Sequence, residues 1–371
     1  MLRALTHGII LLAGAALLCG CPQDSQDNGA DENGVIQYGG KRPAPRSVTL
    51  ELKLAPGDAY TVTTTRTLEY SLLSGEFGAE GEEPQMRSSK SVNATEVIRW
   101  RVDCRGGGAG RLKLAARAES LNSDELSQDS EGETHRVLAL DAGGLKLTLN
   151  DEETAPDAAG RALAAALGQS FTWLVDGRSA FERTGGAWAA AQQARSQPLF
   201  PCIVWERLTE QAMLLPAGET SAGVTEERTA LLPVADGGIP VRLNWMLREV
   251  VGDEGAELAQ IAVQVNGMLE APAGYSVTAD GVRYEGTVER ATVAGSYSMV
   301  FDVAAGHWRC IDSDLTANLT LRVTVGGEEP RLLAVELRNV HLRGTHEFSY
   351  EESGASGPPP ERAPASVPGE Q

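Results

Sequence analysis

Four short patterns in the chain contain residue types that could carry out chemistry. The segment Gly168-Gln169-Ser170-Phe171-Thr172 places a serine where the nucleophile elbow of hydrolases has one. That elbow ends in glycine and leads into a helix, whereas here the segment ends in Thr172 and a strand follows. The glycine-rich run 106–110 lacks the Lys-Ser/Thr pair and the following helix of a phosphate-binding loop. We therefore predict a hairpin turn at 106–110 and no elbow at Ser170.

The other two patterns contain histidines and aspartates. His341 and His346 are five residues apart on a predicted strand, so their side chains should point to opposite faces, which argues against a shared metal ion. Asp312-Ser313-Asp314 lacks the glycine and the distal glutamate of a calcium loop. We expect no metal, no cofactor and no catalytic residue. An enzymatic function is the third of three hypotheses, after the two non-catalytic roles given below. It would depend on acidic residues around a cleft, and substitution of Asp176 and Asp302 would test it.

The most specific motif follows the first apolar stretch. Residues 8–18 are apolar but too few to span a bilayer, and Leu18-Cys19-Gly20-Cys21 then gives way to a polar run. The motif resembles the lipobox of bacterial lipoprotein signal peptides. This resemblance implies that residues 1–20 are a signal peptide and that Cys21 carries a thioether-linked diacylglycerol and a further acyl chain. Cys19 is the rival acceptor, and an ordinary cleaved signal peptide is the alternative.

Charge and composition fit a protein tethered outside the cytoplasm. The chain has 32 basic and 51 acidic residues and a net charge of −19, which disfavours nucleic acid and anionic head groups as partners. After Cys21, residues 22–46 have the composition of a flexible tether that spans about 25–30 Å. Residues 353–371 are expected to be disordered. We predict a lipoprotein of the bacterial cell envelope that faces the periplasm or exterior and is anchored through Cys21, at the inner or the outer membrane.

Strand signals dominate the 305 or so residues between these ends. In 48–54, Val48, Leu50, Leu52 and Leu54 alternate with polar residues, which is the pattern of a half-buried strand. We predict a mainly β fold with two curved antiparallel sheets or half-barrels, arranged as a first β lobe (47–185), a helical connector (186–226) and a second β lobe (227–352). The other predicted strands are 60–73, 92–103, 111–121, 136–140, 145–149, 171–175, 179–183, 241–250, 256–267, 282–289, 296–303, 307–312, 315–325 and 331–340.

Helical signals are restricted to the middle of the chain. Residues 156–167 are rich in alanine, with proline near the start and glycine just past the end. Residues 200–215 have apolar side chains at roughly helical spacing, and 187–195 could form a further helix. We expect these short helices to pack on the sheets.

Two pairs of segments suggest an internal repeat. Residues 97–114 are similar to 242–260, and 168–177 are similar to 295–306, where an aromatic strand led by glycine reaches an aspartate and turns through Gly177 or Gly306. The order of the segments is the same in both halves. We interpret this as a duplicated β unit, with chance similarity between acidic hairpins as the alternative.

With the lipobox and the repeat, the run Leu214-Leu215-Pro216-Ala217-Gly218-Glu219 resembles a family of uncharacterised bacterial lipoproteins that carry a domain of unknown function. The resemblance covers most of 48–350 but departs from the family at Ser221-Ala222, where a tryptophan often follows. It implies no activity. The cysteines that remain after lipidation are Cys104, Cys202 and Cys310, which allow at most one disulfide and leave the pairing open.

Two non-catalytic roles follow from these observations. The leading hypothesis is a structural or interaction module of the envelope, with a protein partner. The alternative is a carrier or sensor of a hydrophobic ligand held in a β-sheet cavity, for which the candidate lining residues are Trp173, Leu208 and Leu215. Outer-membrane lipoprotein carriers resemble this chain at the level of the fold only.

Overall fold

The computed structural model of the chain describes residues 47–76, 85–141, 144–155, 161, 165, 167–185, 201–232, 239–253, 256–279, 282–325 and 331–351. The lipobox-like motif with Cys21, the predicted tether and the predicted tail lie outside these residues. So do the predicted helix at 187–195 and most of the one at 156–167. In the described residues, no helix is both long enough and apolar enough to cross a membrane.

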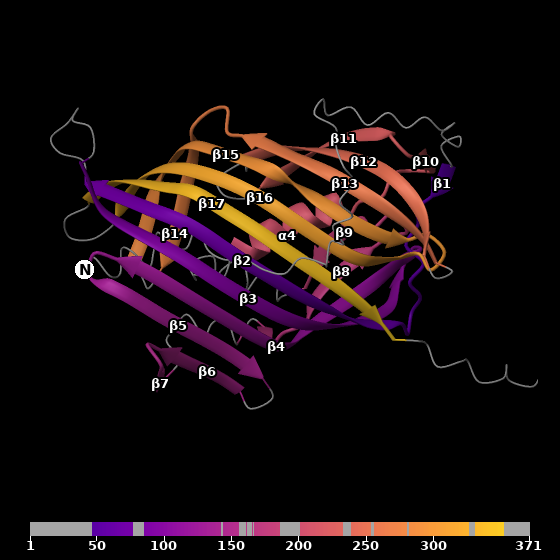
Figure 1. Cartoon of the computed structure of the whole chain (residues 1–371), viewed down its shortest axis with the longest axis horizontal. Helices are drawn as coiled ribbons and strands as arrows, with labels where there is room; N and C mark the ends of the chain where they lie inside the picture. The colour runs from indigo at the N-terminus through magenta and orange to yellow at the C-terminus, as the bar shows by residue number, and fades with distance from the viewer. Residues whose placement is uncertain are drawn as a thin grey trace, which may run out of the picture.

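The predicted mainly β, antiparallel fold is confirmed. One sheet of fifteen strands has the order β11-β12-β13-β15-β16-β17-β2-β3-β4-β5-β6-β7, with β14 beside β15, β8 beside β4 and β9 beside β8 (Figure 1). β1 and β10 form a separate pair. The elements are β1 (Ser47–Thr49), β2 (Ala59–Glu76), β3 (Gln85–Gly108), β4 (Arg111–Asp129), β5 (Gly132–Asp141), β6 (Gly144–Leu149), β7 (Glu152–Thr154), β8 (Phe171–Val175), β9 (Phe181–Thr184), α4 (Pro201–Ala212), β10 (Glu219–Ser221), β11 (Thr225–Leu232), β12 (Ile239–Asp253), β13 (Ala256–Met268), β14 (Ala273–Ala279), β15 (Val282–Asp302), β16 (His307–Val325) and β17 (Arg331–Tyr350).

Strands of both predicted lobes belong to this one sheet. β17, from the predicted second lobe, pairs with β2, from the first, from Tyr350 opposite Tyr60 to Leu333 opposite Glu76. A single hydrophobic cluster contains residues of both halves, such as Leu68 and Leu315. The prediction of two sheets or half-barrels is therefore not confirmed, and the duplicated unit stays a prediction.

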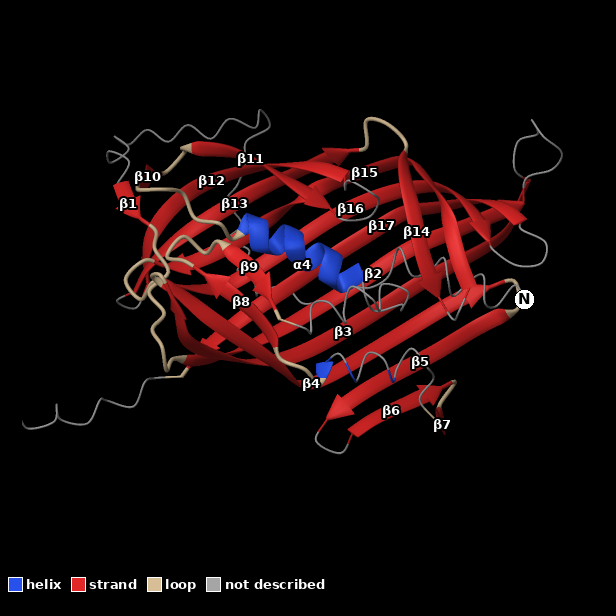
Figure 2. Cartoon of the chain, turned by 180° about the vertical axis from the view of Figure 1, so that it is seen from behind, coloured by secondary structure: helices blue, strands red, loops and turns tan. Residues whose placement is uncertain are grey.

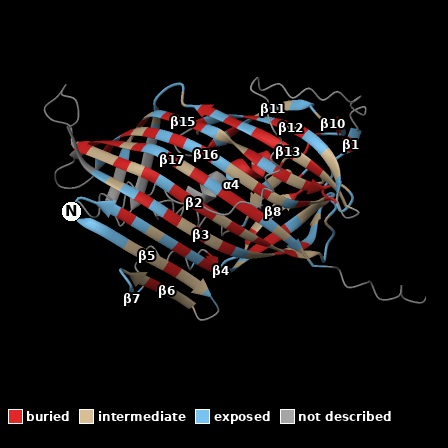
Figure 3. Cartoon of the chain, viewed as in Figure 1, coloured by how far each residue is buried: buried red, intermediate tan, exposed pale blue. Residues whose placement is uncertain are grey.

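The sheet bends around α4, which lies across one of its faces (Figure 2). Buried and exposed residues alternate along the strands, as the striping in Figure 3 shows, because successive side chains point to opposite faces. We call the face that contacts α4 the inner face. The predicted helix at 200–215 is confirmed as α4.

Several strands are longer than the sequence predicts. The predicted strands 282–289 and 296–303 are one strand, β15, and 307–312 and 315–325 are also one strand, β16. The residues between each pair, 290–295 and 313–314, remain in the ladder, and a register shift between Val288 and Arg290 absorbs the irregularity in β15. Gly295 has a φ of +148°, and a β-carbon there would lie 2.1 Å from the carbonyl oxygen of Asp314, so only glycine fits.

The segment 47–54 crosses one end of the sheet. It contacts the turns at Gly177 and Gly306, which occupy equivalent positions in the predicted repeat. Val48, Leu50 and Leu52 are buried, as their alternation predicts, but the predicted strand at 48–54 is wrong beyond Thr49, because only Ser47–Thr49 pair with another strand. The amide of Leu52 donates to the carbonyl of Gly177 (2.7 Å), and the amide of Lys53 donates to that of Gly306 (2.8 Å). Both glycine turns therefore bind the same segment of chain.

Candidate functional site

The inner face carries a row of residues on four neighbouring strands, which are polar except for a glycine on β17. In the ladders, Tyr297 on β15 is opposite Ser313 on β16, Ser313 is opposite Gly344 on β17, and Gly344 is opposite Arg66 on β2. We define the interior polar cluster as Arg66 and Tyr297 of this row together with Glu96, Thr64 and His346, all of which are buried.

An ion pair forms the centre of the interior polar cluster. Arg66 Nη1 lies 3.1 Å from Glu96 Oε1, and the two side chains are only 9 % and 3 % exposed. Gly344 opposite Arg66 has no side chain to compete for the space above the arginine. A buried pair of this kind costs desolvation energy for both ions, so it is better evidence for a specific arrangement than for added stability.

His346 lies next to the ion pair and is neutral. Its Nδ1 shares a hydrogen bond of 3.1 Å with Thr64 Oγ1, and the two residues are opposite each other in the β2–β17 ladder. Burial, reinforced by the nearby charge of Arg66, lowers the pKa of His346 from 6.5 to about 3. His346 therefore acts as a hydrogen-bonding group of the interior and not as a base at neutral pH.

α4 contacts the inner face through polar groups of its last two turns. Thr209 Oγ1 is 3.5 Å from the hydroxyl of Tyr297, which joins the helix to the interior polar cluster. Glu210 accepts hydrogen bonds from Trp173 Nε1 on β8 (2.8 Å) and from Arg183 Nε on β9 (2.9 Å). Burial lowers the pKa of Arg183, and the carboxylate of Glu210 opposes that shift.

The chain leaving α4 bridges two parts of the sheet. We call Leu214 and Leu215, with the arginines that hold them, the helix seam. Arg228 on the edge strand β11 donates from Nη1 to the carbonyl of Leu214. Arg178, in the turn between β8 and β9, donates to the carbonyl of Leu215 from Nε (3.1 Å) and Nη2 (3.0 Å). The seam thus links β11 to the β8–β9 hairpin.

The predicted ligand-binding residues lie around this end of α4. Leu208 and Leu215 are 1 % and 0 % exposed and belong to the main hydrophobic cluster, and the partly buried Trp173 packs against that cluster. The structure therefore places the three residues in one region, as core side chains. Their role in ligand binding stays a prediction.

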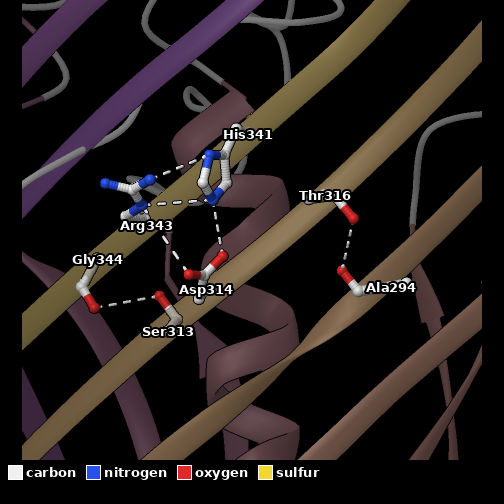
Figure 4. A network of polar contacts seen from close by, with 7 residues as sticks. All are labelled: Ala294, Ser313, Asp314, Thr316, His341, Arg343 and Gly344. Atoms are coloured by element: carbon white, nitrogen blue, oxygen red, sulfur yellow. Dashed lines mark hydrogen bonds and ion pairs between the residues drawn. The ribbon is translucent and has the colours of Figure 1, made fainter.

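The outer face carries a second, more exposed network. His341 Nε2 lies 2.7 Å from Asp314 Oδ1, and Arg343 reaches both residues (Figure 4). Asp312 accepts a hydrogen bond of 2.7 Å from Thr345. The prediction that His341 and His346 point to opposite faces is confirmed. Within the described ranges, no group of three or more histidines, cysteines or acidic residues is placed to hold a metal ion.

Asp176 and Asp302, the acidic residues named for the enzyme hypothesis, stabilise turns. Asp176 Oδ1 accepts the amides of Arg178 and Ala180. Asp302 Oδ1 accepts the amide of Ala305 at 2.8 Å, and its Oδ2 lies 2.7 Å from Arg309 Nη2. These contacts fix the turns that bind the segment 47–54, and each carboxylate has a structural partner.

Of the cysteines considered for a disulfide, Cys104 is a buried thiol. Burial raises its pKa to about 12, so it is a poor nucleophile at neutral pH. The Sγ of Cys310 lies 3.7 Å from Asp312 Oδ2. The side chain of Cys202, on α4, lies outside the described residues, so the pairing stays open.

Sequence reasoning missed the interior polar cluster, although a signal for it exists. In β2, Thr64 and Arg66 stand between Val62 and Leu68 on the buried face. Glu96 likewise falls between Ala94 and Ile98 in β3. Polar residues at apolar positions of a strand indicate buried polar contacts, but the sequence does not show which strands pair.

Comparison with known proteins adds no family. No protein-family model matches the chain. No curated protein matches it either. A search of solved structures returned a crystal structure of Acinetobacter baumannii OccAB4, with 7 % identity, 78 % of this chain and 98 % of that chain covered, and a TM-score of 0.13. A TM-score this low supports no argument, so the resemblance to uncharacterised lipoproteins stays a prediction.

Replacing Arg66 with methionine should lower the free energy of unfolding by about 3–5 kcal/mol, because Glu96 would stay buried without this counter-charge. The double variant Arg66→Met/Glu96→Gln should lose less than the sum of the two single variants. Denaturant titrations measure these values. The exposed pair Arg99–Glu119 provides the control, since Arg99→Met should cost less than about 1 kcal/mol. Equal losses for Arg66→Met and Arg99→Met would contradict this account of the cluster.

Stability should also fall in acid because of His346. Between the unfolded pKa of 6.5 and the folded pKa of about 3, the unfolded chain binds a proton that the folded chain does not. The free energy of unfolding therefore contains the full contribution of neutral His346 above pH 6.5. This contribution decreases by up to about 1.4 kcal/mol per pH unit as the pH falls toward 3. His346→Gln should show a shallower decline than the wild type between pH 6.5 and 4 in urea titrations. Parallel curves would exclude His346 as the titrating group.

Proposed function

We propose that this protein is a lipid-anchored, non-catalytic structural or interaction module of the bacterial cell envelope. The anchoring part of the proposal rests on Leu18-Cys19-Gly20-Cys21 and the polar run that follows it. With two or more acyl chains on one cysteine, an anchor holds a protein stably on a membrane. The acidic body does not need to bind the membrane surface itself.

The observation that carries the non-catalytic part is how the interior polar groups are paired. Arg66 is paired with Glu96, His346 with Thr64, and Glu210 with both Trp173 and Arg183. These pairs join β2, β3 and β17 to one another and α4 to the β8–β9 hairpin. A nucleophile activated by an adjacent base needs a different arrangement, in which a hydroxyl or thiol faces a base with a pKa near neutrality.

Replacing Cys21 with serine should abolish lipid attachment and shift the protein from the membrane to the soluble fraction, because serine offers no thiol for the thioether. Metabolic labelling with a palmitate analogue, followed by fractionation, measures both effects. Cys19→Ser is the matched control and should keep the label and the membrane location. Labelling that survives in Cys21→Ser but disappears in Cys19→Ser would assign the anchor to Cys19 and contradict the proposal.

The carrier hypothesis has its own supporting observation. α4 lies across the inner face of a bent sheet, and its C-terminal end is attached to the sheet through the helix seam and Glu210. Apolar ligands commonly bind between such a helix and a sheet, with a few polar groups to orient them. Trp173, Leu208 and Leu215 lie at this end of the helix.

Native mass spectrometry separates the two roles. The full chain carrying Cys21→Ser, purified gently from a host with a cell envelope, should retain extra mass that organic solvent releases if the protein is a carrier. A bare mass would exclude a co-purifying cargo and favour the interaction module. Crosslinking in intact cells would then identify the protein partner.

A further inference from the structure

Two buried hydrogen-bond donors beside the helix seam lack an acceptor within the described part of the chain. They are Trp245 Nε1 on β12, a residue that is 1 % exposed, and Arg228 Nη2 on β11. Buried donors without acceptors are rare in folded proteins, because each loses its hydrogen bonds to water and gains nothing in return. Other buried polar atoms of the described residues also lack a partner, such as the Tyr70 hydroxyl, but these two are N–H donors on adjacent strands, so one ligand could accept from both.

The two donors lie in one neighbourhood on the inner face. In the β11–β12 ladder, Arg228 is opposite Leu243 and Glu226 is opposite Trp245, so Arg228 and Trp245 are diagonal neighbours. The guanidinium carbon of Arg228 is 5.7 Å from the ring centroid of Trp245. This distance is within the range of a cation–π contact, which fixes the guanidinium over the ring.

The rest of the Arg228 guanidinium is already occupied. Nε donates to Glu226 Oε1 (2.9 Å), and Nη1 donates to the carbonyl of Leu214. Nη2 therefore remains for a further acceptor. Glu226 is 39 % exposed and β11 is the edge strand of the sheet, so this corner is open to solvent on one side and buried at Trp245 on the other.

We infer that Arg228 and Trp245 bind the carboxylate head group of a single-chain amphiphile at the edge of the sheet beside α4. This inference rests on the carrier hypothesis and names its ligand class.

The charges of the corner fit one negative charge. Arg228 and Arg178 supply two positive charges, Glu226 supplies one negative charge, and the C-terminal end of α4 adds about −0.5. The sum is about +0.5, which favours a monoanion over a dianionic phosphate. A carboxylate has two acceptor oxygens, one for each unpaired donor.

The surroundings of the donors favour an amphiphile over a free anion. Leu243 and Leu247, the neighbours of Trp245 on the same face of β12, are 1 % and 0 % exposed. Leu215 of the helix seam is 0 % exposed. An alkyl chain that follows the carboxylate would therefore have apolar neighbours, and these side chains of the core and the helix seam, which are closely packed here, must move apart to admit it.

The test is titration calorimetry of the full chain carrying Cys21→Ser with three probes: dodecanoate below its micellar concentration, dodecan-1-ol and acetate. The inference predicts binding of dodecanoate that is at least tenfold tighter than that of either other probe. Trp245→Phe, which removes the N–H and keeps an aromatic ring, should weaken dodecanoate by about three- to tenfold. Arg228→Met should weaken it by more than tenfold.

Trp100→Phe is the control, because Trp100 lies on β3 and packs edge-on against Phe171, whereas the two donors lie on β11 and β12. It should change the affinity less than twofold. Melting curves identify any variant that does not fold. The comparison of the three probes uses the chain with Arg228 and Trp245 intact, so it does not depend on the folding of these variants.

The outcomes separate this inference from the carrier hypothesis. Equal affinity for dodecanoate and dodecan-1-ol would overturn the carboxylate site and leave an apolar carrier. Acetate binding as tightly as dodecanoate would overturn the assignment to an amphiphile. If neither dodecanoate nor dodecan-1-ol binds, buried water is the acceptor for the two donors. Both the carboxylate site and the carrier hypothesis then lose their support.

Discussion

The structure depends on the antiparallel pairing of β2 with β17. This ladder joins strands from opposite ends of the chain, and its register places Gly344 opposite Arg66 and His346 opposite Thr64. A shift of one residue would turn every inward side chain of one strand outward. The same register therefore makes one sheet, the main hydrophobic cluster that contains residues of both halves, and the interior polar cluster.

A bent sheet must cover its inner face, and here α4 contributes to that cover. The helix is attached to the sheet by a small number of polar contacts: Thr209 to Tyr297, Glu210 to the β8–β9 hairpin, and the helix seam to two arginines. Polar contacts in an apolar surrounding are directional, so they fix the position of the helix more strictly than apolar packing alone. A helix attached in this way would serve either proposed role, as a rigid interaction surface or as a cover over a ligand.

Local features of this chain could be predicted from the sequence, whereas long-range ones could not. The burial of alternate residues at 48–52, the helical spacing at 200–215 and the opposite orientation of His341 and His346 all depend on the geometry of one segment. The lengths of β15 and β16 were underestimated because Gly295 and the polar pair Ser313-Asp314 resemble turns, although both lie inside a long ladder. Thr64 and His346 are 282 positions apart, and no local pattern shows that they share a hydrogen bond. The interior polar cluster, which combines residues of four strands, therefore became visible only in the structure.

The most direct test of the single-sheet arrangement is native-state hydrogen exchange, followed by mass spectrometry at increasing denaturant concentration. If β2 and β17 join the halves into one cooperative unit, the core amides of the β3–β4 and β12–β13 hairpins should lose protection in the same opening step, with the same dependence on denaturant. Loss of protection in one hairpin at clearly lower denaturant, while the other stays protected, would show that the halves open separately and would contradict this account.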